Sequence, residues 1–156
     1  MSESSASNSP TASRCEYSAA FLLLRLFLGL RTLMAGLEKF ELNRSYSTDN
    51  YSANMAKMAS GISNNSVIPL WAAKAFALPL GYLLIILGVA VLLGIKQRIT
   101  LFVTGLLYVG LAFGLMAVGS IEGEGIAWLG MHVLMFAVAL VLARHNRFAL
   151  CGDKSE

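Results

Sequence analysis

The stretch AAFLLLRLFLGLRTLMAGLEKF, residues 19–40, decides the fold class of this chain. It is long enough to cross a bilayer core of about 30 Å, which takes about 20 apolar residues in a helix. It nevertheless contains four ionisable residues, Arg25, Arg31, Glu38 and Lys39. Arg31 falls near the middle, where an unsolvated charge costs at least about 2.5–3.5 kcal/mol. Because such charges need other helices, water or a ligand around them, the stretch predicts a membrane bundle with a polar interior.

The composition of the whole chain also indicates a membrane protein. Of its 156 residues, 56% are hydrophobic and only 13% are charged, whereas soluble domains contain about 25% charged residues. The net charge of +3 is small, and no basic patch alternates with exposed aromatic residues, so no nucleic-acid partner is expected. The spacing of the chain matches no zinc site, haem site or phosphate-binding loop.

Three further apolar stretches complete the predicted architecture, an all-α membrane protein with a four-transmembrane-helix bundle. The spans lie at about 19–40, 70–95, 99–118 and 125–143, within a domain of residues 19–147, and Pro79 is expected to kink the second. The Ser-rich residues 1–18 are expected to be disordered. They lack the basic region of a signal peptide, so the first span is expected to remain in the mature protein.

The charges of the short loops predict the orientation of the bundle. Lys96 and Arg98 separate the second and third spans, and Arg144, Arg147 and Lys154 follow the fourth. The turn between the third and fourth spans, residues 120–124, holds two acids and no base. The positive-inside rule therefore places both termini and the tail of residues 148–156 in the cytoplasm. The expected location is the inner membrane of a bacterium.

The first outer loop, residues 41–69, contains one helical pattern. Tyr51, Met55, Met58 and Ile62 recur at helical spacing, which predicts a short interfacial helix lying on the membrane surface. An ordinary loop helix that caps the bundle is the alternative. Cys15 and Cys151 both fall on the predicted cytoplasmic side, where two free thiols are more typical than a structural disulfide.

Helical periodicity divides the first span into two polar stripes. One is a seam of small and polar residues, Arg25, Gly29, Thr32, Gly36 and Lys39, and such a seam suits close helix packing. Arg31, Ala35 and Glu38 form the neighbouring stripe. Alternatively, Glu38 and Lys39 lie among the lipid headgroups, and Arg25 extends toward the cytoplasmic side.

A candidate ligand site combines the first and fourth spans. Arg31 lies about nine residues from Phe40, and His132 about eight from Glu124, so at 1.5 Å per residue they share a depth in the outer half of the membrane. The sequence places no acid at that level, which would leave Arg31 to bind an electron-rich ligand. Tyr108 could add its hydroxyl, while Arg25, Lys39 and Glu38 complete the candidate ligand-binding set. A purely structural contact of Arg31 and His132 is the alternative.

Two more features concern the outer mouth and the packing of the third span. The mouth is expected to be ringed by Glu122, Glu124, Glu38, Lys39 and Lys74, with Trp71 and Trp128 at the interface. Gly110 and Gly114 form a GxxxG pair, which supports tight helix packing and no particular function.

The first span also resembles the opening signature of the DoxX-like family of four-helix membrane proteins. In that family an Arg is followed by a Gly four residues on, and then by a Gly and a Lys near the helix end, which Arg25, Gly29, Gly36 and Lys39 match. The second span, with a Pro followed by two glycines six apart and closing as LLGIKQR, and the tail RHNRFALCGD resemble the family as well. Two departures are that Ala35 replaces a common His and that residues 79–94 lack the common acid.

This resemblance implies a quinone-linked redox function, because the family includes the membrane subunit of thiosulfate:quinone oxidoreductases. The first hypothesis is therefore a membrane oxidoreductase subunit in which Arg31 and His132 bind quinone. The second is a non-catalytic accessory subunit that packs against a larger respiratory or transport complex, or against copies of itself. The third is a carrier of a small solute or lipid.

The predicted orientation can be tested by labelling cysteines in intact cells. A cysteine placed at Ser63, in the first outer loop, should react with a membrane-impermeant maleimide, and native Cys15 and Cys151 should not. Labelling after permeabilisation is the control that all three thiols are reactive. The reverse pattern would show that the bundle is inserted the other way round.

Overall fold

The computed structural model describes the backbone of residues 10–117 and 123–145, and the side chains of residues 16–116 and 125–144. Within these ranges the chain is mostly helical. The elements in order are α1 (Pro10–Leu37), η1 (Glu38–Phe40), β1 (Glu41–Leu42), β2 (Ser45–Tyr46), α2 (Thr48–Asn65), α3 (Leu70–Leu93), α4 (Gln97–Ala117), α5 (Gly123–Leu142) and η2 (Ala143–His145).

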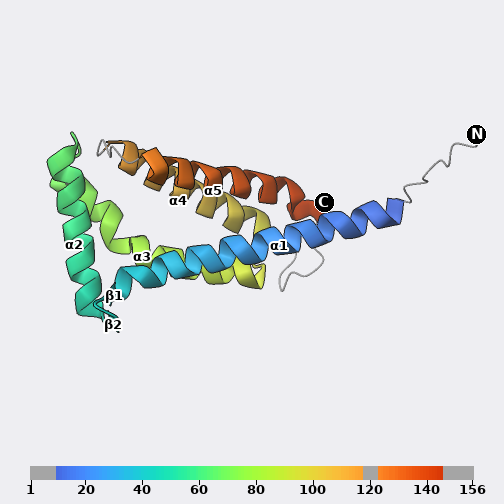
Figure 1. Ribbon diagram of the computed structural model, residues 1–156, viewed down its shortest axis with the longest axis horizontal. Coiled ribbons are helices and arrows are strands. Elements are labelled where there is room, and N and C mark those ends of the chain that lie inside the picture. The colour runs from blue at the N-terminus through green and yellow to red at the C-terminus, as the bar shows by residue number, and fades with distance from the viewer. Residues whose placement is uncertain (1–9, 118–122, 146–156) are drawn as a thin grey trace, which may run out of the picture.

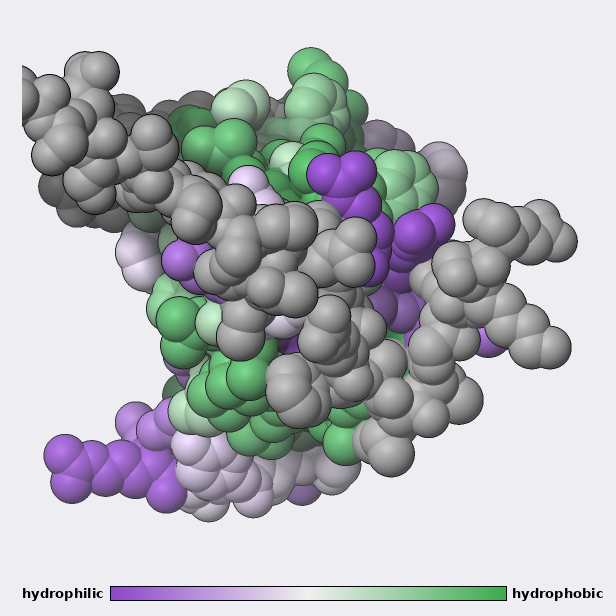
Figure 2. Space-filling model, turned by 90° about the vertical axis from the view of Figure 1, so that its right-hand side faces the viewer, coloured by the Kyte–Doolittle hydropathy of each residue, from purple (hydrophilic) through white to green (hydrophobic). Residues whose placement is uncertain are grey.

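Four of these helices are long and apolar enough to cross a membrane. They cover Glu16–Phe40, Leu70–Leu93, Gln97–Met116 and Gly125–Leu142, which agrees with the predicted spans to within a few residues. Large apolar side chains point outward from them: Leu23 is 71% exposed and Ile86 is 64% exposed. In Figure 2 such apolar residues form much of the described surface. This is the surface expected of a multi-pass membrane protein.

The structure corrects the expected disorder of residues 1–18 in their second half, residues 10–18. Helix α1 extends back to Pro10, so residues 10–18 are helical. Proline suits the first turn of a helix, where its missing N–H is not needed, and lengthening an existing helix needs no new nucleus. Residues 1–9 and the predicted tail 148–156 lie outside the described residues.

The four long helices form two packed pairs, α1 with α3 and α4 with α5. Figure 1 shows α1 entering the bundle at the end where α5 finishes, here called the terminal end, with α2 lying across the opposite end. The two pairs are close together at the terminal end and diverge toward α2. A main core joins them, built around Leu28 of α1, Leu84 of α3, Tyr108 of α4 and Phe136 of α5.

The α1–α3 pair packs so closely that its contact points must be glycines. A Cβ on Gly88 would lie 2.6 Å from the backbone nitrogen of Leu33, and one on Gly36 would lie 2.9 Å from that of Ile85. Backbone atoms of a packed helix cannot shift to relieve such contacts, so only small residues permit this approach. The predicted seam lies at this contact: Arg25, Gly29, Thr32 and Gly36 are buried, and Lys39 is half-buried.

The GxxxG pair of the third span does not make such a contact. A Cβ on Gly110 would be 3.7 Å from the ring of Phe76, an ordinary distance, and one on Gly114 would meet no atom within 4 Å. The expectation of tight packing at this pair is therefore wrong. These two glycines border open space between α3 and α4.

Helix α2 forms at the predicted helical pattern. Ser47 caps its first turn by accepting a hydrogen bond from the Asn50 N–H at 3.0 Å. Tyr51, Met55, Ala59 and Ile62 are buried and form a second core cluster with Ala73 and Ala77 of α3. The helix therefore packs on the first half of α3 and caps the bundle.

A short hairpin precedes α2. β1 pairs with β2 through a two-residue turn in which Asn43 and Arg44 have φ values of 52° and 63°. Two positive φ angles characterise the tight turn that matches the strand twist. Asparagine favours this conformation but arginine does not, so the sequence carried little signal for the hairpin.

Tyr51 fastens α2 to the bend of α3. Pro79 has no N–H, which removes one hydrogen bond of α3 and favours a bend there, and Figure 1 shows α3 bending beside α2. The Tyr51 hydroxyl donates to the Leu78 carbonyl and accepts from the Gly81 N–H at 3.2 Å. A Cβ on Gly81 would lie 2.5 Å from the Tyr51 ring. Burial raises the pKa of the Tyr51 hydroxyl, which keeps it protonated as a donor.

Two further aromatic rings complete this attachment. Phe40 of η1 stacks on Tyr51 with ring centroids 4.4 Å apart. Tyr82 of α3 meets both rings edge-on, at 5.2 Å from Phe40 and 4.9 Å from Tyr51. Such pairs contribute about 0.5–1.5 kcal/mol each beyond the area they bury. The end of α1, the start of α2 and the bend of α3 are therefore held at one point.

We expect Gly88→Ala to destabilise the protein by about 1–3 kcal/mol, because the new methyl group overpacks the α1–α3 contact. Unfolding in mixed micelles measures the change. Gly130→Ala is the matched control, since a Cβ there meets no atom within 4 Å. Equal stability of the two variants would contradict the close packing of α1 on α3.

We expect Tyr51→Phe to destabilise the attachment of α2 by about 1–3 kcal/mol, the cost of leaving buried backbone groups unpaired. Hydrogen exchange of α2 amides should become faster, while exchange in α4 changes little. Tyr46→Phe is the control, because Tyr46 is exposed and donates its hydrogen bond to Glu41 on the surface. Unchanged exchange in Tyr51→Phe would show that the hydroxyl does not hold α2.

Candidate functional site

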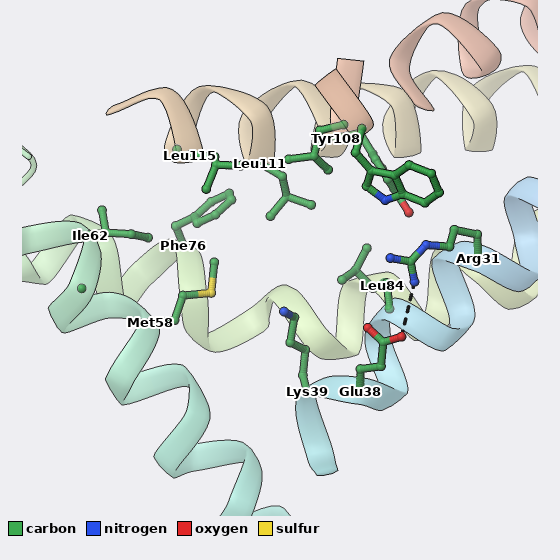
Figure 3. A pocket seen from close by; sticks show the side chains of 15 residues that line it. Arg31, Glu38, Lys39, Met58, Ile62, Phe76, Leu84, Tyr108, Leu111 and Leu115 are labelled. Atoms are coloured by element: carbon green, nitrogen blue, oxygen red, sulfur yellow. Dashed lines mark hydrogen bonds and ion pairs between the residues drawn. The ribbon is translucent and has the colours of Figure 1, made fainter. Parts of the chain in front are cut away.

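A cavity of about 390 Å³ lies between the two helix pairs, at the end of the bundle that α2 caps. Figure 3 shows its labelled side chains converging from α1, η1, α2, α3 and α4. Most of its walls are apolar. The lining residues whose side chains can form hydrogen bonds or carry charge are Arg31, Glu38, Lys39, Tyr108 and Trp128.

Arg31 enters the cavity from α1 and is paired with an acid. Its Nη1 lies 3.4 Å from Oε1 of Glu38, two turns further along the chain. The guanidinium carbon also lies 5.9 Å from the ring centroid of Trp128, within the range of a cation–π interaction. This corrects the expectation that no acid lies near Arg31. Backbone depth separates the two residues by about 10 Å of helix rise, but their long side chains bridge that distance.

Lys39 presents its charge to the cavity, and no described residue pairs with it. Its side chain rises from η1 into the space between Met58 and Leu84 (Figure 3). Among the described residues, no side chain or carbonyl hydrogen-bonds or forms an ion pair with its ammonium. Its backbone is fixed, because the Asn54 side-chain amide donates to the Lys39 carbonyl at 3.1 Å and to the Glu41 carbonyl at 3.0 Å.

Tyr108 of α4 reaches the cavity from the opposite pair of helices. Its hydroxyl lies 3.3 Å from Oγ1 of Thr32 in the α1 seam. Thr32 already donates its proton to the Leu28 carbonyl at 2.7 Å, so Tyr108 is the donor in their shared bond. A lone pair of the Tyr108 oxygen is left to accept a hydrogen bond.

His132 does not line the cavity, so the predicted pocket shared by Arg31 and His132 is wrong. The His132 side chain is 1% exposed, and its Nδ1 donates to the Trp128 carbonyl at 2.8 Å. Its ring stacks on Tyr108 at 5.5 Å and meets the Trp128 ring edge-on at 4.7 Å. His132 lies near the site, as its depth in the membrane predicts. The rings of Tyr108 and Trp128, however, lie between the His132 ring and the cavity.

Of the remaining predicted site residues, some line the cavity and others do not. Arg25 is buried in the α1 seam and is not a lining residue of the cavity. Of the predicted outer mouth, Glu38 and Lys39 line the cavity, whereas Lys74 is exposed and does not. Trp128 lines it and Trp71, at 75% exposed, does not. Glu122 and the Glu124 side chain lie outside the described residues.

Sequence reasoning missed the apolar walls of the site. Phe76 and Leu84 come from α3, Leu111 and Leu115 from α4, and Gly61 from α2. Met58 and Ile62 were recognised as one face of a helix, but helical spacing does not say whether that face meets a core or a cavity. Apolar residues in a membrane protein carry no signal of this kind, because core, cavity and lipid all favour them.

The arrangement suits an amphiphilic ligand. Among the lining residues that the structure describes, two cations and one acid leave one positive charge without a partner, placed where apolar walls lower the dielectric constant and strengthen its field. An electron-rich head group can accept hydrogen bonds from Lys39 and Arg31. Across residues 16–116 and 125–144, no cluster of three or more His, Cys, Asp or Glu could hold a metal ion.

Comparison of the chain with models of known protein families, with curated proteins and with solved structures finds no match.

Proposed function

We propose that this chain is a DoxX-like membrane subunit that binds a quinone and works with a partner redox protein. The observation that carries the proposal is a cavity of about 390 Å³ in which the Arg31 and Lys39 cations and the Glu38 carboxylate meet mostly apolar walls. This volume lies in the range of small-molecule sites, about 300–1,000 Å³. The resemblance of residues 22–40 to the DoxX-like signature supports the same ligand.

The lining residues fit a quinone head group. Its carbonyl oxygens accept hydrogen bonds, and the Lys39 ammonium and the Arg31 guanidinium supply donors that stay charged in each contact. Charge-assisted hydrogen bonds of this type are stronger than neutral ones. Trp128 and Phe76 offer flat aromatic surfaces for the ring, and Leu84 and Leu111 exclude water from it.

A bound quinone would supply the redox chemistry, taking two electrons from the partner protein and two protons to become a quinol. The residues of this chain would orient it and stabilise negative charge on its oxygens. Lys39 is the better placed of the two cations, because Glu38 already neutralises Arg31 at 3.4 Å. Tyr108 would accept a hydrogen bond from the hydroxyl group of the reduced ligand, since its own proton is donated to Thr32.

The same proposal places the chain in a bacterial inner membrane with both termini in the cytoplasm. Lys96 and Arg98, between α3 and α4, and Arg144, after α5, are basic and support this orientation. The polar loop of residues 41–69, which contains α2, agrees with it. Helix α2 would then lie at the outer membrane surface, with Tyr51, Met55 and Ile62 turned toward α3 and its opposite, polar face toward water.

Quinone binding by purified variants tests the proposal. We expect Lys39→Met to weaken the binding of a short-tailed benzoquinone about tenfold or more, because a hydrogen bond to a charged group contributes about 1.5–3 kcal/mol and 1.4 kcal/mol is tenfold in affinity. Arg31→Gln should weaken it less, since Glu38 shares the Arg31 charge. The affinity is measured by titration in detergent, alongside a thermal unfolding scan.

Lys74→Met is the matched control, because Lys74 is an exposed lysine that does not line the cavity. It should bind quinone as the unchanged protein does. If Lys39→Met and Arg31→Gln both fold and bind quinone normally, the proposal is wrong. Subunits that co-purify with a protein free of quinone would favour the accessory-subunit hypothesis, and solute uptake into proteoliposomes would favour the carrier.

A further inference from the structure

A second cavity of about 260 Å³ adjoins the first. Ile62 of α2, Phe76 of α3 and Gly114 of α4 line both of them. The other residues that line the second cavity are all apolar or glycine: Ile68, Ala72, Ala73, Gly110 and Phe113. The two cavities therefore lie side by side and share part of their walls, at the end of the bundle where the helix pairs diverge.

The second cavity reaches the outer surface of the bundle between α3 and α4. Phe113 on its rim is 66% exposed, on the surface that faces lipid in a membrane. Its inner end meets the first cavity beside Phe76, whose ring Figure 3 shows extending from α3 toward Leu111 and Leu115. Gly110 and Gly114 of α4 border open space here, because a Cβ on Gly110 would lie at an ordinary 3.7 Å from the Phe76 ring and one on Gly114 would meet nothing within 4 Å. A larger side chain at either position would extend into this space.

We infer that the second cavity holds the apolar tail of the ligand, so that the site takes a long-tailed quinone that enters sideways from the membrane. The inference rests on the proposed function and extends it to the ligand class. The head would lie at Lys39 and Arg31, and the tail would pass Phe76 and leave between α3 and α4. A water-soluble quinone without a tail would leave the second cavity to lipid.

The second cavity would select a quinone tail by its shape more than by its hydrophobicity. The tail leaves one apolar medium for another, because lipid chains are as apolar as the cavity walls. The gain comes from fitting a groove that glycines have left open, and it is lost when a side chain fills that groove. This explains why α4 has a GxxxG pair that makes no close helix contact.

The test compares two quinones with the same head group, one with a single isoprenoid unit and one with at least four. Trp128 lines the first cavity, so quenching of its fluorescence reports head-group binding once Trp71, which lies outside both cavities, is replaced by Phe. In this background Gly110→Leu should weaken binding of the long-tailed quinone about tenfold or more, the scale on which a blocked pocket discriminates ligands. Binding of the short-tailed quinone should stay within about twofold.

Ala72→Leu, on the opposite wall of the second cavity, is a second variant with the same expected result if Gly110→Leu fails to fold. Gly130→Leu is the control, because Gly130 is exposed on α5 and lines neither cavity. Unchanged affinity for the long-tailed quinone, or an equal loss for both quinones, would overturn the tail site and leave the proposed function standing. Failure of the parent protein to bind either quinone would overturn both.

Discussion

The close approach of α1 to α3 is the constraint on which the rest of the structure depends. Gly88 lies against the Leu33 backbone, and Gly36 against that of Ile85, so the two helices meet where neither has room for a side chain. This contact fixes the rotation of α1 about its axis. With the seam of Thr32 and Gly36 turned toward its neighbours, the next stripe, which carries Arg31 and Glu38, is turned toward the space between the helix pairs.

The bend of α3 provides the second constraint. Pro79 removes one hydrogen bond of α3, and the Tyr51 hydroxyl binds the backbone on both sides of it, at the Leu78 carbonyl and the Gly81 N–H. Because Tyr51 belongs to α2, these two hydrogen bonds also fix the position of α2 beside the bend of α3. Met58 and Ile62, about two and three turns beyond Tyr51 on the same helix, are thereby brought to the wall of the cavity.

The charges of the site follow from these positions. A mid-membrane arginine is costly unless it is solvated or paired, and the 3.4 Å contact with Glu38 together with the ring of Trp128 lowers that cost for Arg31. Lys39 has no such partner among the described residues, since the fold of η1 directs it into the cavity and away from Glu38. The charged groups of α1 and η1 therefore face walls from α2, α3 and α4 that are mostly apolar, which is the distribution that an amphiphilic ligand requires.

The sequence by itself determined the four long apolar helices, the buried seam of α1 and the helix at residues 48–65, because each depends on composition or on a repeat within one segment. Only the tertiary structure decided that Glu38 pairs with Arg31, that Tyr108 and Trp128 separate His132 from the cavity, and that Gly110 and Gly114 border open space. Those contacts depend on the bend at Pro79, on the spacing of the helix pairs and on the directions of long side chains. A repeat within one helix contains no information on any of these three quantities.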